Sequence, residues 1–295
     1  MMAIKSTTPA GCYPSCRKGS RMFRILATVA TALFAACSTG PSEPLAEDVV
    51  FVAVEEDGTL IALEGTSGEV LGTADLSQEQ HGDTVRFDVH NAQTAPDGRT
   101  IWVTAMPADD GGGHGAMPEQ LIAVDAWGLK VRDRIELGED LHVAHVVIAG
   151  QRALVTAYDA DAVLVVDLDG LAVERSIPLP AGTSPHGARL TPDGATLVVA
   201  GMGDGSLHLV GVADGTVTSY DLPGRAVQAA VLPDATAVFA SVYDTRQVAR
   251  MDLQSRELVL FDLPAGAAGP VQIYPTPDSR HLWVADQGLV DDDPA

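Results

Sequence analysis

Three histidines recur in one register of this 295-residue chain, each six residues ahead of a predicted tight turn: His90, His142 and His186. Neutral imidazoles that converge from three directions are suitable ligands for zinc, copper or iron. The alternative is that each ring bonds a neighbouring backbone carbonyl and stiffens its strand. His145 offers a second register for the middle copy, and valines occupy the position in the last two copies.

A glycine-rich stretch, residues 107–119, supplies a second set of candidate ligands. Asp109, Asp110 and His114 offer hard and intermediate donor atoms, and Met117 a soft one. Glycines allow the backbone to approach a ligand closely, and binding residues concentrate on loops carried by a rigid scaffold. We therefore predict ligand binding by this loop, with a mobile loop of no function as the alternative.

The turns that follow the histidines form a repeat. Copies begin at Pro96, Ile148, Pro192, Pro233 and Pro277, 41 to 52 residues apart. A large or branched apolar residue lies six positions after each start: Trp102, Leu154, Val198, Phe239 and Trp283. Pro-Asp-Gly is turn chemistry rather than carboxylate catalysis. The apolar residues, both tryptophans included, are predicted to belong to the core.

Each turn lies between short β-rich segments, and a complete repeat contains four of them. Three such segments precede the first complete repeat (residues 49–54, 60–63 and 70–76), four complete repeats follow, and two segments end near residue 286. Four short strands in 41–44 residues is the period of a propeller blade. A blade cannot bury its faces alone, so the copies must pack on one another. The predicted fold is an all-β propeller.

The pattern His-x5-Pro-Asp-Gly, followed by a Leu/Trp-Val-rich strand and a strand ending in Val-Asp, resembles the YVTN (YncE-type) seven-bladed propellers over about residues 49–288. These are similar in turn to the haem d1 propeller of cytochrome cd1 nitrite reductase. The resemblance implies seven blades, whereas the repeats supply about five to six. The expectation is a propeller incomplete at its C-terminus, occupying residues 49–295.

The N-terminal region has the pattern of a bacterial lipoprotein signal. Basic residues precede a 12-residue apolar run, and Phe-Ala-Ala precedes Cys37. We expect a signal peptide over residues 1–36, with the true start at Met1 or Met22, and lipid attachment at Cys37. An ordinary cleaved signal is the alternative. Residues 37–48 have the composition of a flexible tether.

Charge and cysteine content exclude several functions. The chain has 18 Lys and Arg against 40 Asp and Glu, a net charge of −22, which argues against a nucleic-acid partner. All three cysteines lie in the first 37 residues, so the propeller has no thiol nucleophile and no cysteine-based metal site. The motifs of a P-loop, a zinc protease and a serine-hydrolase elbow are missing from the sequence. No catalytic residue is assigned.

These observations favour a non-catalytic binding or scaffolding propeller. It would be attached to the membrane, most simply the outer membrane, by the lipid, with its propeller in the periplasm or at the cell surface. An envelope protein or a small ligand would bind to a propeller face. The alternative is a metal- or haem-dependent periplasmic redox protein that uses the histidines at the channel mouth. A propeller hydrolase or lactonase fits less well, because such enzymes hold calcium on axial carboxylates.

Overall fold

The computed structural model describes residues 2–7, 48–80, 82–108 and 117–287. Within these ranges it contains strands and no helix. Accordingly, the part of the chain that the structure describes has no helix of a length and hydropathy that would cross a bilayer. The predicted lipid attachment site Cys37 and the loop residues Asp109, Asp110 and His114 lie outside the described residues.

Five four-stranded antiparallel sheets and a final two-stranded sheet follow one another along the chain. The first sheet consists of β1 (Met2–Thr7), β2 (Asp48–Val54), β3 (Thr59–Glu64) and β4 (Val70–Asp75). The second consists of β7 (Phe87–Thr94), β8 (Thr100–Pro107), β9 (Glu119–Asp125) and β10 (Val131–Gly138). A separate hairpin, β5 (Gln78–Gln80) and β6 (Asp83–Val85), lies between them in sequence.

The remaining sheets repeat this order. The third consists of β11 (Val143–Ala149), β12 (Arg152–Ala157), β13 (Ala162–Asp167) and β14 (Ala172–Pro178). The fourth consists of β15 (Pro185–Leu190), β16 (Thr196–Gly201), β17 (Ser206–Gly211) and β18 (Val217–Asp221). The fifth consists of β19 (Ala226–Val231), β20 (Ala237–Val242), β21 (Gln247–Asp252) and β22 (Leu258–Asp262), and the sixth of β23 (Pro270–Pro275) and β24 (Leu282–Asp286).

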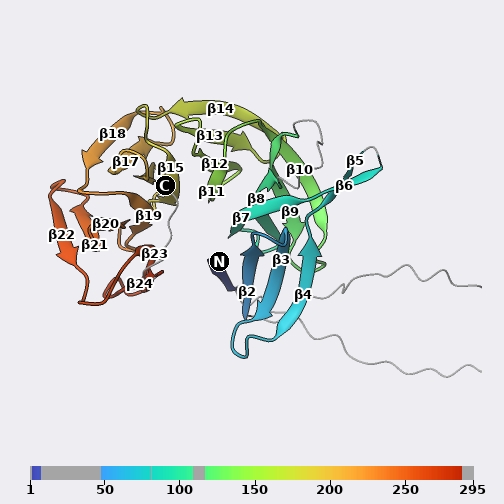
Figure 1. Ribbon diagram of the computed structural model, residues 1–295, viewed down its shortest axis with the longest axis horizontal. Helices are drawn as coiled ribbons and strands as arrows, with labels where there is room; N and C mark the ends of the chain where they lie inside the picture. Colours follow the sequence, from blue (N-terminus) through green and yellow to red (C-terminus); the bar gives the residue numbers. More distant parts are fainter. Residues whose placement is uncertain (1, 8–47, 81, 109–116, 288–295) are drawn as a thin grey trace, which may run out of the picture.

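The sheets stand around a common axis, as the blades of a β-propeller do (Figure 1). The first strands β7, β11, β15, β19 and β23 each contact the next one in the series and so form the inner wall. In Figure 1 the ring is open between the sixth sheet and the first. The all-β propeller prediction is confirmed, with its three strands (β2–β4), four complete blades and two closing strands where the sequence predicts them.

The structure adds β1, which pairs with β2 in antiparallel register from Met2 with Ala53 to Thr7 with Asp48. This strand falls within the segment that the sequence predicts as a signal peptide. The cleaved leader therefore stays a prediction, and in the full chain its first residues complete the first sheet.

Alternation along the strands builds apolar layers between neighbouring sheets from the first to the fifth. On β13, Val163 and Val165 face the fourth sheet, while Leu164 and Val166 face the second. Such two-sided burial is the period-two geometry of a strand covered on both faces. Similar layers join the first sheet to the second and the fourth to the fifth. Burial of these apolar layers therefore contributes to holding the blades together.

The repeated turns are stabilised by their aspartates, as predicted. Asp97 Oδ1 accepts hydrogen bonds from the backbone N–H groups of Arg99 (2.8 Å) and Thr100 (2.9 Å). Gly98 follows with φ +64°, a left-handed conformation that glycine adopts without steric cost. These side-chain bonds engage the turn aspartates within their own turns.

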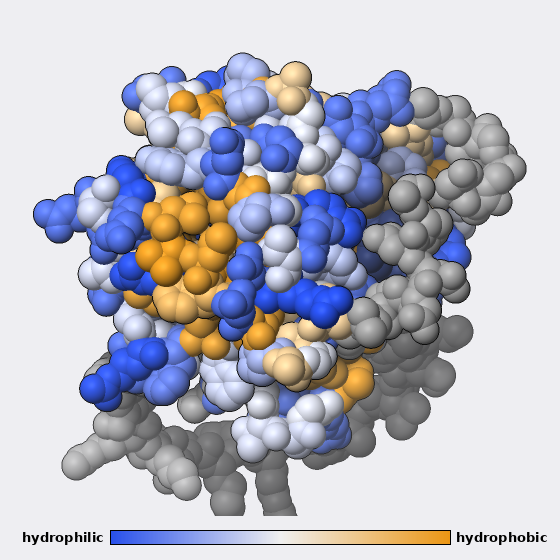
Figure 2. All heavy atoms as spheres, turned by 60° about the vertical axis from the view of Figure 1, so that its left-hand side comes forward, coloured by the Kyte–Doolittle hydropathy of each residue, from blue (hydrophilic) through white to orange (hydrophobic). Residues whose placement is uncertain are grey.

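The two tryptophans at the repeated apolar position differ. Trp102 is 6% exposed and packs in the layer against the third sheet, whereas Trp283 on β24 is 72% exposed. The prediction of a buried Trp283 is wrong, because no described sheet covers the outer face of β23 and β24. Figure 2 shows apolar surface gathered among hydrophilic residues on the side of the molecule that carries β22, where Val259, Leu260 and Phe261 are also exposed.

Candidate metal centre

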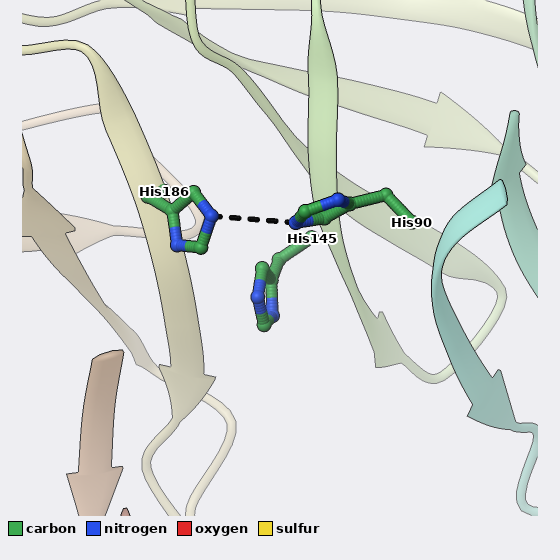
Figure 3. Close-up of side chains that lie close together, drawn as sticks. All are labelled: His90, His145 and His186. Atoms are coloured by element: carbon green, nitrogen blue, oxygen red, sulfur yellow. Dashed lines mark hydrogen bonds between the residues drawn. The ribbon is translucent and has the colours of Figure 1, made fainter. Parts of the chain in front are cut away.

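Three histidines from three successive inner strands meet at one point. His90 lies on β7, His145 on β11 and His186 on β15. Each offers a ring nitrogen, and these nitrogens lie within 4.8 Å of one another. Figure 3 shows the three rings converging from their separate strands.

The contact between His90 and His186 places this cluster at the axis. Their Nε2 atoms are 3.3 Å apart although the residues are 96 positions apart and belong to the second and fourth sheets. The third sheet lies between those two along the ring, so their side chains can meet only inside it. His145 comes from that intervening sheet, with ring centroids 5.9 Å from His90 and 5.2 Å from His186.

Hydrogen bonds at the far nitrogens fix which ring nitrogens are available to an ion. His186 Nδ1 lies 2.9 Å from the carbonyl oxygen of Val227, which can only accept, so Nδ1 carries the proton. His90 Nδ1 lies 3.1 Å from Glu55 Oε1. The hydrogen bond to His90 lowers the pKa of Glu55 despite its partial burial, which keeps the carboxylate an acceptor. Nε2 of His186 therefore presents a lone pair when the ring carries its proton on Nδ1, and Nε2 of His90 does so in the tautomer that donates to Glu55.

The 3.3 Å contact between the two Nε2 atoms is satisfied either by a proton on one of them, as a hydrogen bond, or by a metal ion between them. Zinc–imidazole bonds are about 2.0–2.1 Å long and tetrahedral, which puts two ligating nitrogens about 3.3–3.4 Å apart. The observed separation of the Nε2 atoms, 3.3 Å, agrees with that value. The separation of these two nitrogens is therefore compatible with a shared metal ion.

His145 is the most deeply placed of the three rings, at 1% exposure. Its Nδ1 is buried and has no hydrogen-bond partner, which is costly for a polar atom. Burial lowers the pKa of His145 well below its usual value, with smaller effects from His186, Arg189 and His90. Burial, followed by His90, also lowers the pKa of His186 to about 4. At neutral pH both rings are uncharged, which is the state that binds a metal.

The structure does not bring His142 to this cluster and brings His145 instead. His142 is exposed at the entry to β11, with φ +48°, its ring against Tyr158 (5.0 Å) and its Nδ1 3.8 Å from Asp159 Oδ2. The physical reason is a shorter turn. Thr94 pairs with Ile101 across β7–β8 but Ile148 with Ala153 across β11–β12, a loop two residues shorter.

Because the β11–β12 loop is two residues shorter, positions of β11 that are counted back from the turn are displaced by two residues relative to β7. Val89 pairs with Ala105 and Val143 with Ala157, so His90 corresponds to Ala144. His145 is the next residue and lies in a bulge that interrupts the pairing of β11 with β12. A bulge re-aims the side chain it carries. The alternative register at His145 is the one that the structure brings to the axis.

A threonine that sequence reasoning missed fastens two of the histidine strands together. Thr156 Oγ1 on β12 accepts from the backbone N–H of His145 (2.9 Å) and donates to the carbonyl of His186 (2.8 Å). Thr104 bridges Asn91 and Ala144 in the same way one sheet earlier. The sequence did carry a signal for this bridge. A hydroxyl residue occupies the same position of the second strand in three sheets, as Thr104, Thr156 and Ser241.

Of the glycine-rich loop, residues 107–119, the structure describes only the two ends. These confirm no ligand and identify one structural residue. Met117 is 8% exposed and packs in the apolar layer between the first and second sheets, so it is not available as a ligand. Glu119, which ends the loop, was missed as a structural residue. Its carboxylate accepts three backbone N–H groups at 2.7 Å, from Leu141, His142 and Val143. It thereby fixes the entry to the strand that carries His145.

No family model and no curated protein matches the chain. Among solved structures, it is similar to the hydrazine synthase of Kuenenia stuttgartiensis, with a TM-score of 0.64, 15% identity, and 86% of this chain and 77% of that chain covered. It is also similar to virginiamycin B lyase from Staphylococcus aureus in two structures. One is the selenomethionine-substituted form (TM-score 0.55, 18% identity, 67% and 63% covered) and the other a catalytically inactive histidine-to-alanine variant with quinupristin (0.57, 18%, 71% and 66%).

These proteins are β-propellers, and at such identities the likeness concerns the fold alone. The chain spans just under two thirds of the length of each lyase chain. The protein is thus a β-propeller with a three-histidine cluster at its axis.

Proposed function

We propose that the protein is a metal-binding propeller of the bacterial cell envelope, which holds one transition-metal ion on His90, His145 and His186. The observation that carries this proposal is the 3.3 Å approach of two Nε2 atoms whose Nδ1 atoms are both occupied by acceptors. The unpartnered, buried Nδ1 of His145 supports it independently.

Zinc is the ion that fits best. Three imidazole nitrogens within 4.8 Å of one another, two of them 3.3 Å apart, would leave a fourth position open in a tetrahedral zinc site. Copper and iron also bind imidazole, and either would favour the redox alternative. Binding rather than catalysis is the proposed role, because the sequence offers no nucleophile motif and the cluster's three nitrogens would all serve as ligands.

The proposed location rests on the N-terminal region. A basic segment, an apolar run and Cys37 are typical of a lipoprotein signal, and they support attachment to the membrane through a lipid. The propeller would then face the periplasm or the cell surface, where an envelope protein or a small ligand could reach its faces. The net charge of −22 supports attraction of cations and not of nucleic acid.

Metal content of the purified full chain tests the proposal. After dialysis against a chelator and then against zinc, elemental analysis should give about one zinc per chain, and the triple variant His90→Ala, His145→Ala, His186→Ala should retain none. His142→Ala and His281→Ala, two histidines outside the cluster, serve as matched controls and should bind as the parent does. A parent protein without metal, or a triple variant that binds equally, would overturn the proposal.

The same preparation separates the alternatives. Protein isolated from its own host that contains copper or iron, and that is reduced and reoxidised through one electron, would assign a redox role. Zinc as the isolated metal would support the binding role.

A further inference from the structure

A second charged group reaches the axis beside the histidines. Arg189 lies on β15, three residues after His186. Its Nη2 donates to the Tyr274 hydroxyl at 3.2 Å, and its guanidinium carbon lies 5.3 Å from the centre of the Tyr274 ring. Because Tyr274 belongs to the sixth sheet and Arg189 to the fourth, the contact skips the fifth sheet and runs through the interior of the ring.

The charge of Arg189 has no counter-charge among the residues that the structure describes. Its Nη1 donates to the carbonyl of Ala188 (2.7 Å), and its other partner is the neutral phenol of Tyr274. The exposed arginines are different: Arg152 pairs with Glu174 at 2.5 Å and Arg225 with Asp244 at 2.8 Å.

An interior cation without an anion is costly, since burial disfavours the charged form. Burial lowers the pKa of Arg189, and Tyr274 opposes that shift only in part. A guanidinium remains protonated even so, because its intrinsic pKa is so high. The electrostatic cost is removed when an anion from solution occupies the site.

The geometry of the two side chains selects the kind of anion. A guanidinium presents a planar fork of donors that matches two oxygens of a carboxylate or of a phosphate, and its single positive charge balances one carboxylate. Tyr274 accepts from Arg189, so its own hydroxyl proton is free to donate to the same ligand. The fork and the hydroxyl thus offer donors side by side, with no acidic group of the described chain competing for them.

Arg189 and His186 lie on the same inner strand. Three residues of strand separate Arg189 from His186, about 10 Å along β15. The flexible arginine side chain can shorten that distance.

We propose that Arg189 and Tyr274 form an anion-binding subsite in the axial channel, which takes a carboxylate of a small organic acid. The subsite depends on these two residues alone. Its second role, in which the bound acid also approaches the ion held by the histidines, rests on the proposed function.

Calorimetric titration of the metal-free full chain at constant ionic strength tests the subsite, with succinate and inorganic phosphate as probes. Succinate should bind saturably and more tightly than phosphate. Arg189→Met should weaken succinate binding at least tenfold, Arg189→Lys should weaken it less, and Tyr274→Phe a few-fold. Arg134→Met is the matched control, because Arg134 is a half-buried arginine that donates to the carbonyls of Leu76 and Ser77, and it should change nothing.

Several outcomes would overturn the subsite: no saturable binding of succinate, equal binding by the parent and by the folded Arg189→Lys and Tyr274→Phe variants, or tighter binding of phosphate. If Arg189→Met does not fold, those two variants decide the question. Repeating the titration with zinc-loaded protein tests the shared ligand, for which succinate affinity should rise several-fold. Succinate binding by a protein that binds no zinc would keep the subsite and reject the metal site.

Discussion

Glu55 illustrates how a residue outside the cluster can control it. It reaches His90 from the first sheet, holds the proton on Nδ1 and thereby directs the Nε2 lone pair toward the axis. Carboxylates that orient a metal-bound histidine typically contribute 10–100-fold to metal affinity. Glu55 is a positioning residue in this sense.

We therefore expect Glu55→Ala to weaken zinc binding by about tenfold. Glu55→Gln should weaken it less, because the amide oxygen can still accept from Nδ1. Competition against a chromophoric zinc chelator measures both constants. Glu56→Ala, at the exposed neighbouring position, is the control, and an affinity equal to the parent's in Glu55→Ala would contradict the assignment.

At this scale the sequence could predict two of the three histidines that meet at the axis. His90 and His186 stand in one register and the structure brings them together. His145 could not be separated from His142, because the register was counted from the turn, and the β11–β12 turn is two residues short. Arg189 carried no signal, since its contact with Tyr274 joins strands 85 residues apart through the ring.

At the scale of the elements, the stability of the repeated turns depends on the ionisation of their aspartates. In the last three complete turns a threonine hydroxyl donates to the turn aspartate, at 2.6 Å for Asp193, 2.7 Å for Asp234 and 2.6 Å for Asp278. These hydroxyl bonds, followed by backbone N–H groups, lower the pKa of each carboxyl. The turns are therefore most stable when their aspartates are ionised.

The lowered pKa of these carboxyls determines how the free energy of unfolding changes with pH. A carboxyl whose pKa is lower in the folded than in the unfolded chain binds fewer protons when folded, so its contribution is complete above the ordinary aspartate pKa and is lost as pH falls below it. We expect the triple variant Asp193→Asn, Asp234→Asn, Asp278→Asn to show a shallower decline in stability below about pH 4. Urea unfolding at pH 5 and at pH 3 measures this, and equal slopes for variant and parent would contradict it.

The two tryptophans give a second prediction for the sheets. Trp102 is buried between two sheets, so Trp102→Ala should lower the free energy of unfolding by about 3–5 kcal/mol. Trp283→Ala, at an equivalent position of the sixth sheet, should cost under about 0.5 kcal/mol, because the side chain is 72% exposed. Denaturant unfolding compares the two, and similar losses would show that Trp283 is covered in solution.

The positions of the strands could be predicted from the sequence. Period-two burial, Pro-Asp turns and a 41–44-residue repeat together specify four-stranded sheets, and every predicted strand of the complete blades is found. The exposure of Trp283 could not follow, because a residue's register shows which way it faces but not whether another sheet lies there. Pairing of β1 was also not foreseeable, since its segment has the composition of a leader.

For the whole molecule, attachment to the envelope is the prediction that matters most. Expression of the full gene in a Gram-negative host should give a chain that begins at Cys37 with a diacylglyceryl group, detected by mass spectrometry of the membrane fraction. Cys37→Ala should abolish the modification. An unmodified parent protein that retains its first 36 residues would contradict the signal and would agree with β1 as part of the mature first sheet.

The spread of the three histidines over three inner strands has a thermodynamic consequence. Their positions lie 41 to 96 residues apart, so an unfolded chain would have to close long loops to gather them and would hold an ion poorly. Any ion bound at the axis then favours the assembled ring by mass action, by about 4 kcal/mol when the free ion exceeds its dissociation constant a thousandfold. Occupancy would thus stabilise the assembly of the three sheets that carry the histidines, and loss of the ion would destabilise the second, third and fourth sheets first.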